Sequence, residues 1–163
     1  MRTLPALVFL AVIGSAGAVF ADREQQVPAQ WQWRHGQTQG QITALINQGY
    51  RVIDIEVEST SPLRFAASFV RNTGAYAMPT TWIPNISPAS LQTLVGLANL
   101  RIIDLERFVI GNQVRISCIV VPNVGPYAKA WWWHTNRTAQ QVADMVASTR
   151  GRIVDLDTFN VGS

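Results

Sequence analysis

Apolar residues recur at intervals of three and four positions in three stretches of the chain. These stretches are residues 38–49, 87–100 and 138–150. In the first stretch, Ile42, Leu45 and Ile46 follow this spacing. Such spacing places apolar side chains along one side of an α-helix. The pattern therefore predicts three amphipathic helices.

Each predicted helix begins with residues that are typical of a helix N-terminus. Thr38 and Thr138 are each followed three positions later by glutamine, which is the spacing of a capping box. Ser87 precedes Pro88, and proline is favoured at the first position of a helix. Side-chain chemistry and periodicity therefore predict the same three helix starts.

Apolar and polar residues alternate between the predicted helices. Residues 51–56, 101–106 and 152–157 read RVIDIE, RIIDLE and RIVDLD, and residues 64–72 and 115–123 form a second pair of similar stretches. All five stretches are rich in β-branched or aromatic residues, which favours strands. Gly111 and Asn112, and residues 59–62, separate neighbouring strands with turn-forming residues, which predicts antiparallel hairpins.

One face of the second kind of strand is expected to lie in the core. Side chains two positions apart in a strand share a face. The apolar members are Phe65, Ala67 and Phe69 in one strand and Ile116, Cys118 and Val120 in the other. Cys118 is thus expected to be a buried thiol, and no internal disulfide is possible because it is the single cysteine.

The whole pattern repeats at an interval of about fifty residues, the mark of a tandem-repeat protein. Each complete unit contains a helix, a strand, a turn, a second strand and an Asn-x-Gly-x-Tyr-Ala loop that leads to tryptophan, and the last unit stops after its first strand. The units are residues 31–80, 81–130 and a truncated unit, 131–163. We predict a single α+β repeat domain at 31–163, with one curved, mainly antiparallel sheet of about five strands and three helices on one face. The last strand, 152–161, would lie at an open edge and permit self-association.

The N-terminus has the order of a secretory signal peptide. A short positive start at Arg2 precedes an apolar run, and small residues at Ala18 and Ala21 suit cleavage. We therefore assign residues 1–21 to a signal peptide and 22–30 to a linker, and expect a secreted or periplasmic protein. No later stretch is apolar for the length that a membrane span requires.

Charge excludes one class of partner. The formal net charge is +3, and only 14% of residues are charged. The basic residues are scattered along the chain, whereas a nucleic-acid surface needs them clustered. We therefore expect no nucleic-acid partner.

The recurring block Arg-[Val/Ile]-[Ile/Val]-Asp-[Ile/Leu]-[Glu/Asp], the Arg-led strand and the Asn-x-Gly-x-Tyr-Ala loop resemble the family called bacterial tandem repeat domain 1. Similar repeats form the N-terminal part of polyglycine hydrolases, whose activity lies with a C-terminal β-lactamase-like serine domain. The resemblance implies a half-barrel of repeats with an accessory or binding role. It does not imply hydrolysis, because Lys129, the sole lysine, has Pro126 where the serine motif needs its nucleophile.

Paired carboxylates recur once in each unit. They are Asp54 with Glu56, Asp104 with Glu106, and Asp155 with Asp157. Such pairs can hold a hard cation or act as general acid and base. A repeated pair more often does the same structural work each time, and Arg64 and Arg115 are candidate cross-strand partners. With only two histidines, a zinc site has little material, so we expect neither a metal site nor a cofactor.

Tryptophans are the main candidates for ligand contact. Trp33, Trp82 and Trp133 occupy equivalent places in the three units. Trp31 lies at the first of these junctions, and Trp131, Trp132 and His134 lie at the last. Flat indole rings can stack on sugars or pack against peptides while the ring nitrogen donates a hydrogen bond. The competing interpretation is that equivalent tryptophans fill the contact between helix and sheet.

The sequence therefore favours an exported, non-catalytic binding or scaffold module that contacts a peptide, glycan or protein through a tryptophan-rich rim or the concave sheet. One alternative is a small secreted hydrolase that pairs a strand carboxylate with His134 or His35. Another is a fragment of a longer repeat array that is accessory to a hydrolase.

Overall fold

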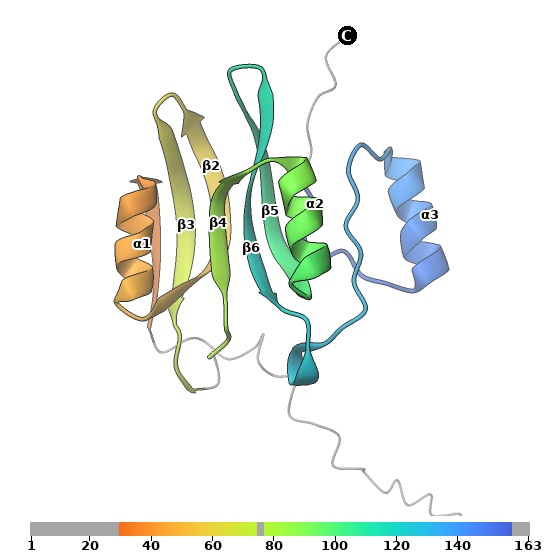
Figure 1. Ribbon diagram of the computed structural model, residues 1–163, viewed down its shortest axis with the longest axis horizontal. Helices are drawn as coiled ribbons and strands as arrows, with labels where there is room; N and C mark the ends of the chain where they lie inside the picture. The colour runs from red at the N-terminus through yellow and green to blue at the C-terminus, as the bar shows by residue number, and fades with distance from the viewer. Residues whose placement is uncertain (1–29, 75–76, 158–163) are drawn as a thin grey trace, which may run out of the picture.

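The computed structural model describes residues 30–74 and 77–157 (Figure 1). The elements in chain order are β1 (Trp31–Gln37), α1 (Gln39–Asn47), β2 (Tyr50–Thr60), β3 (Leu63–Arg71), β4 (Thr81–Ile86), α2 (Pro88–Leu97), β5 (Leu100–Ile110), β6 (Gln113–Pro122), the short 3-10 helix η3 (Gly125–Tyr127) and α3 (Ala139–Thr149). The expected signal peptide, 1–21, and most of the expected linker lie outside the described residues.

The strands form two sheets. Each contains three antiparallel strands, in the orders β1-β3-β2 and β4-β6-β5. The α+β class, the antiparallel pairing and the three helices are confirmed. The prediction of one curved sheet is wrong, because each repeat completes its own sheet and neither sheet curls or closes within the described part of the chain.

The difference comes from two strands that the sequence pattern did not predict. β1 and β4 contain the tryptophan segments that we assigned to loops, and each pairs with the last strand of its own repeat. Pro84 interrupts β4, and the register shifts between Ile83 and Ile86. Proline is tolerated here because β4 is an edge strand, in which one side of the backbone needs no ladder partner.

The helix starts match their predictions. Thr38 and Thr138 form capping boxes with the glutamines at the third helical position. Ser87 caps α2 by accepting a hydrogen bond from the backbone N–H of Ser90. Side-chain oxygens thus satisfy backbone donors that a helix leaves unpaired at its N-terminus.

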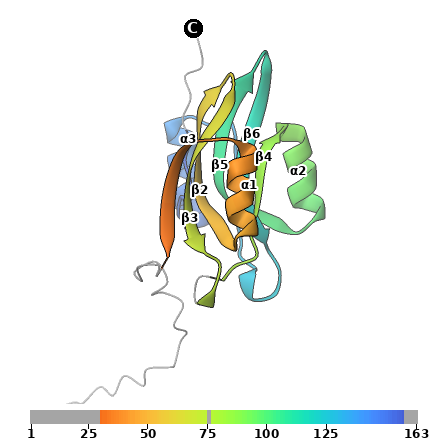
Figure 2. The same cartoon turned by 90° about the vertical axis from the view of Figure 1, so that its left-hand side faces the viewer.

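The hairpins are also confirmed. β2 pairs with β3 and β5 with β6, and both hairpin turns lie at the same end of the molecule (Figures 1 and 2). The predicted inward faces are buried: Phe65, Ala67, Phe69, Ile116, Cys118 and Val120 are each no more than 2% exposed. These faces pack against Ile42 of α1 and Leu91 of α2, respectively.

The two repeats pack through what we call the joint. Trp82 of β4 and Ile119 of β6 belong to the core cluster of the first repeat, together with Phe65 and Ile55. The second sheet therefore presents one face to α2 and the opposite face to the first repeat. Burial of apolar side chains at the joint makes the two repeats one continuous core.

The third repeat is less complete. Residues 152–157 do not form the strand that we predicted, and 158–161 lie outside the described residues. α3 contains no buried residue. The predicted terminal strand is therefore wrong for 152–157, because the described chain supplies no central strand with which it could pair.

Candidate functional site

Trp82 lies inside the joint. Only 9% of its surface is exposed, and its ring meets Phe65 edge to face, with centroids 5.1 Å apart. Its indole nitrogen donates a hydrogen bond to Ser117 Oγ at 3.0 Å. A buried indole with both its ring and its N–H engaged has little surface left for a ligand.

Trp33 occupies the equivalent place in the first repeat but is 56% exposed. Its ring stacks on His35, with centroids 5.3 Å apart. Trp31 lies two positions earlier on the same edge strand and is 62% exposed. Because side chains two positions apart share a face, Trp31 and Trp33 form one exposed surface, which we call the aromatic face. The sequence places Trp31 at the same tryptophan junction as Trp33, and the structure puts both on this edge strand.

The predicted aromatic cluster at the third repeat divides between two environments. Trp131 and Trp133 are partly buried against the core of the second repeat. Trp132 is 58% exposed, and His134 is also exposed. Equivalence by sequence therefore does not give equal accessibility.

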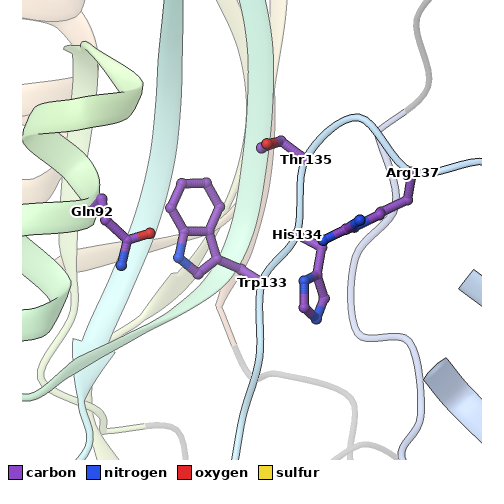
Figure 3. A pocket seen from close by; sticks show the side chains of 5 residues that line it. All are labelled: Gln92, Trp133, His134, Thr135 and Arg137. Atoms are coloured by element: carbon purple, nitrogen blue, oxygen red, sulfur yellow. The ribbon is translucent and has the colours of Figure 1, made fainter. Parts of the chain in front are cut away.

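A hollow lies beside this cluster. It is lined by Gln92 of α2 and by Trp133, His134, Thr135 and Arg137. Figure 3 shows the indole of Trp133 directed toward Gln92, whereas His134 and Arg137 lie on the other side of the loop. This hollow offers hydrogen-bonding groups around one partly covered aromatic ring.

The predicted contact residues thus lie in three places. Trp33 belongs to the aromatic face, Trp82 to the joint, and residues 131–134 to the third repeat. They do not form one continuous exposed rim, because Trp82 is buried between the other two places.

The repeated aspartates bind backbone N–H groups of the preceding repeat. Asp104 Oδ2 accepts a hydrogen bond from Ile55 N at 3.1 Å. One repeat later, Asp155 Oδ2 accepts from Leu105 N at 2.9 Å. β2 and β5 are edge strands, so one side of each backbone has no neighbouring strand in its own sheet. The aspartates therefore satisfy strand edges that would otherwise lack an acceptor.

A related contact strengthens this interpretation. Asp157 Oδ2 accepts from Arg107 N at 3.0 Å. The expected arginine partners contact other groups: Arg64 Nη1 donates to the carbonyl of Leu63, and Arg115 donates to the side chain and carbonyl of Asn85. The repeated carboxylates act on backbone more than on these arginines.

Crowding of carboxylates at the joint changes their protonation. Burial raises the pKa of Asp104 to about 7, and the neighbouring charges of Asp155 and Asp54 act in the same direction. Burial and the charge of Glu56 raise the pKa of Glu106 to about 8. Each raised pKa shows that the charged form is disfavoured where like charges share a poorly solvated space.

The raised pKa values of Asp104 and Glu106 would suit a general acid. The described contact of Asp104, however, is with the backbone of a neighbouring strand. Asp104 is 8% exposed and bonded to Ile55. His35 contacts Trp33, and His134 lines the hollow, so their described contacts are with other groups.

The buried thiol of Cys118 is a further reactive group. Burial raises the pKa of the Cys118 thiol to about 12, which keeps it protonated. Among the described residues, no group of three or more histidine, cysteine, aspartate or glutamate side chains could hold a metal ion. No helix among them is long and apolar enough to cross a membrane.

No family model matches the chain, and no curated protein or solved structure matches it. The resemblance to the tandem repeat family therefore remains a prediction from the sequence pattern.

Proposed function

We propose that this chain is an exported, non-catalytic binding module that holds a protein or peptide partner against the aromatic face. One observation carries the proposal. Trp82 is 9% exposed in the joint, whereas Trp33, in the same place of the first repeat, is 56% exposed. The first repeat thus presents the kind of surface that the second repeat uses to bind a neighbour.

The joint indicates what such a partner should offer. Trp82 packs on the Phe65 ring, and Asp104 accepts a hydrogen bond from the backbone N–H of Ile55 at the edge of β2. On the first sheet, Trp33 and Asp54 lie opposite the same central residue, Ser68. A partner with an apolar surface beside an unpaired strand edge would suit both groups, so a polypeptide fits better than a sugar.

Tryptophan fluorescence provides a direct test. The mature protein is titrated with glycine-rich peptides, peptidoglycan fragments and common polysaccharides. We expect a saturable shift with a peptide, and loss of that shift in Trp31→Ala/Trp33→Ala. Trp132→Ala is the matched control, because Trp132 is 58% exposed but lies outside the aromatic face, and it should keep the shift.

Two results would contradict the proposal. One is the absence of a shift with every peptide. The other is a shift that survives the double substitution and disappears in Trp132→Ala, which would assign binding to the third repeat.

A further inference from the structure

The two complete repeats share one strand order. In β1-β3-β2 and β4-β6-β5, the central strand is the last of its repeat in the sequence. It runs antiparallel to both neighbours and supplies most of the buried face, as β6 does with Ile116, Cys118 and Val120. The central strand is therefore the element that makes each sheet cohesive.

The third repeat has counterparts of the two outer strands, already held in place. Asp155 bonds to Leu105 as Asp104 bonds to Ile55. Trp133 packs on the core of the second repeat, as its counterpart Trp82 packs on the core of the first. Both outer segments are thus attached to the preceding repeat in the manner of the complete units, yet residues 131–134 and 152–157 form no strands.

Apolar side chains within residues 152–157 are exposed. Ile153, Val154 and Leu156 are 49%, 63% and 61% exposed. α3 repeats the apolar pattern of α1, but it buries no residue, whereas Ile42 of α1 is fully buried. Its counterpart in α3, Val142, is only partly buried. A helix with an apolar side needs a sheet to cover, and the central strand of that sheet is missing from the described chain.

We propose that the third repeat binds an extended segment of a separate polypeptide as its central strand. The segment would lie between residues 131–134 and 152–157, antiparallel to both, with apolar side chains at alternate positions. Addition of a strand supplies affinity through main-chain hydrogen bonds and specificity through alternate side chains. This inference goes beyond the aromatic face, because it concerns the opposite end of the molecule (Figure 1).

The chain itself provides the probe. A synthetic peptide with the sequence of β6, residues 113–122, carries the required alternation, and Cys118→Ser removes its thiol. The matched control peptide also carries Ile116→Asp and Val120→Asp. We expect saturable binding of the first peptide to the full chain by calorimetry, and binding at least tenfold weaker for the control. Hydrogen exchange at 152–157 and in α3 should slow when the first peptide binds.

Variants of the chain locate the binding site. Leu156→Glu should weaken peptide binding at least tenfold, because its counterpart Leu105 packs toward the buried face of the second sheet. Leu97→Glu should have little effect, because Leu97 is 80% exposed on α2. Trp31→Ala/Trp33→Ala should also leave this binding unchanged, which separates this inference from the proposed function.

Three outcomes would overturn the inference. They are failure of the β6 peptide to bind, equal binding of the control peptide, and slow exchange at 152–157 in the peptide-free chain. The last would show that the position is already filled.

Discussion

At the scale of single residues, position in the repeat array determines what a tryptophan does. Trp82 and Trp33 have the same place in their repeats, but among the described residues only Trp82 packs on a preceding repeat. Its ring and indole N–H are both engaged, whereas Trp33 contacts His35 at the surface. Sequence equivalence predicted the shared position, but it could not predict accessibility, which depends on a neighbouring unit.

This contrast gives a matched pair of substitutions. Trp82→Ala should lower the free energy of unfolding by about 3–5 kcal/mol, because it removes a large buried ring and leaves a cavity. Trp33→Ala should change it by less than about 1 kcal/mol, because the ring is mainly exposed. Urea denaturation followed by circular dichroism measures both values. Equal losses of unfolding free energy in the two variants would contradict the view that Trp82, but not Trp33, stabilises the core.

At the scale of elements, the joint combines an apolar contact with a polar one. The Trp82 ring packs against Phe65, and the Asp104 carboxylate accepts from the edge of β2. A carboxylate can satisfy a strand N–H without extending the sheet, so β2 and β5 are in contact while their sheets remain separate. The repeated carboxylates therefore help to explain why the repeats stack as two sheets.

The raised pKa values of Asp104 and Glu106 predict that the stability of the protein depends on pH. Asp104 and Glu106 shift from their usual values of 3.8 and 4.5 to about 7 and about 8. Between these pH values the two carboxyl groups remain protonated in the folded chain, whereas they release their protons in the unfolded chain. The free energy of unfolding should therefore fall as the pH rises from about 4 to about 8.

Asp104→Asn tests the cause of this fall. Asparagine keeps an oxygen acceptor for Ile55 N but carries no charge. The fall should become smaller, and at pH 8 the variant should be at least as stable as the wild type. Asp144→Asn is the control, because Asp144 is exposed on α3 and should leave the profile unchanged. Thermal melts from pH 4 to pH 8 measure the profiles, and a steeper fall in Asp104→Asn would contradict the explanation.

Local signals predicted the elements that depend on local chemistry. The capping residues Thr38, Ser87 and Thr138 marked the helices, and alternation marked both hairpins. β1 and β4 were missed because tryptophan, glycine and proline in short polar segments also suit loops. Their extended form depends on pairing with β3 and β6, which are distant in sequence.

At the scale of the whole molecule, each repeat covers a face that the previous repeat leaves open. Periodicity showed that units recur, but it did not specify whether consecutive units join edge to edge or stack. The wrong prediction of one sheet arose from this ambiguity. The candidate surfaces share it, because the faces at the two ends of the array have no neighbouring unit within the described part of the chain.

Stability should consequently decrease toward the third repeat. α1 contains the fully buried Ile42 and α2 the fully buried Leu91, whereas α3 contains no buried residue. Local opening needs less free energy where few apolar contacts must be broken. We expect amides of α3 to exchange at least tenfold faster than those of α1 and α2, although α1 and α3 both have capping boxes. Hydrogen exchange with mass spectrometry measures this gradient, and α1 serves as the internal control because its cap is the same. Equal protection in all three helices would mean that packing on a complete sheet does not limit helix opening in this array.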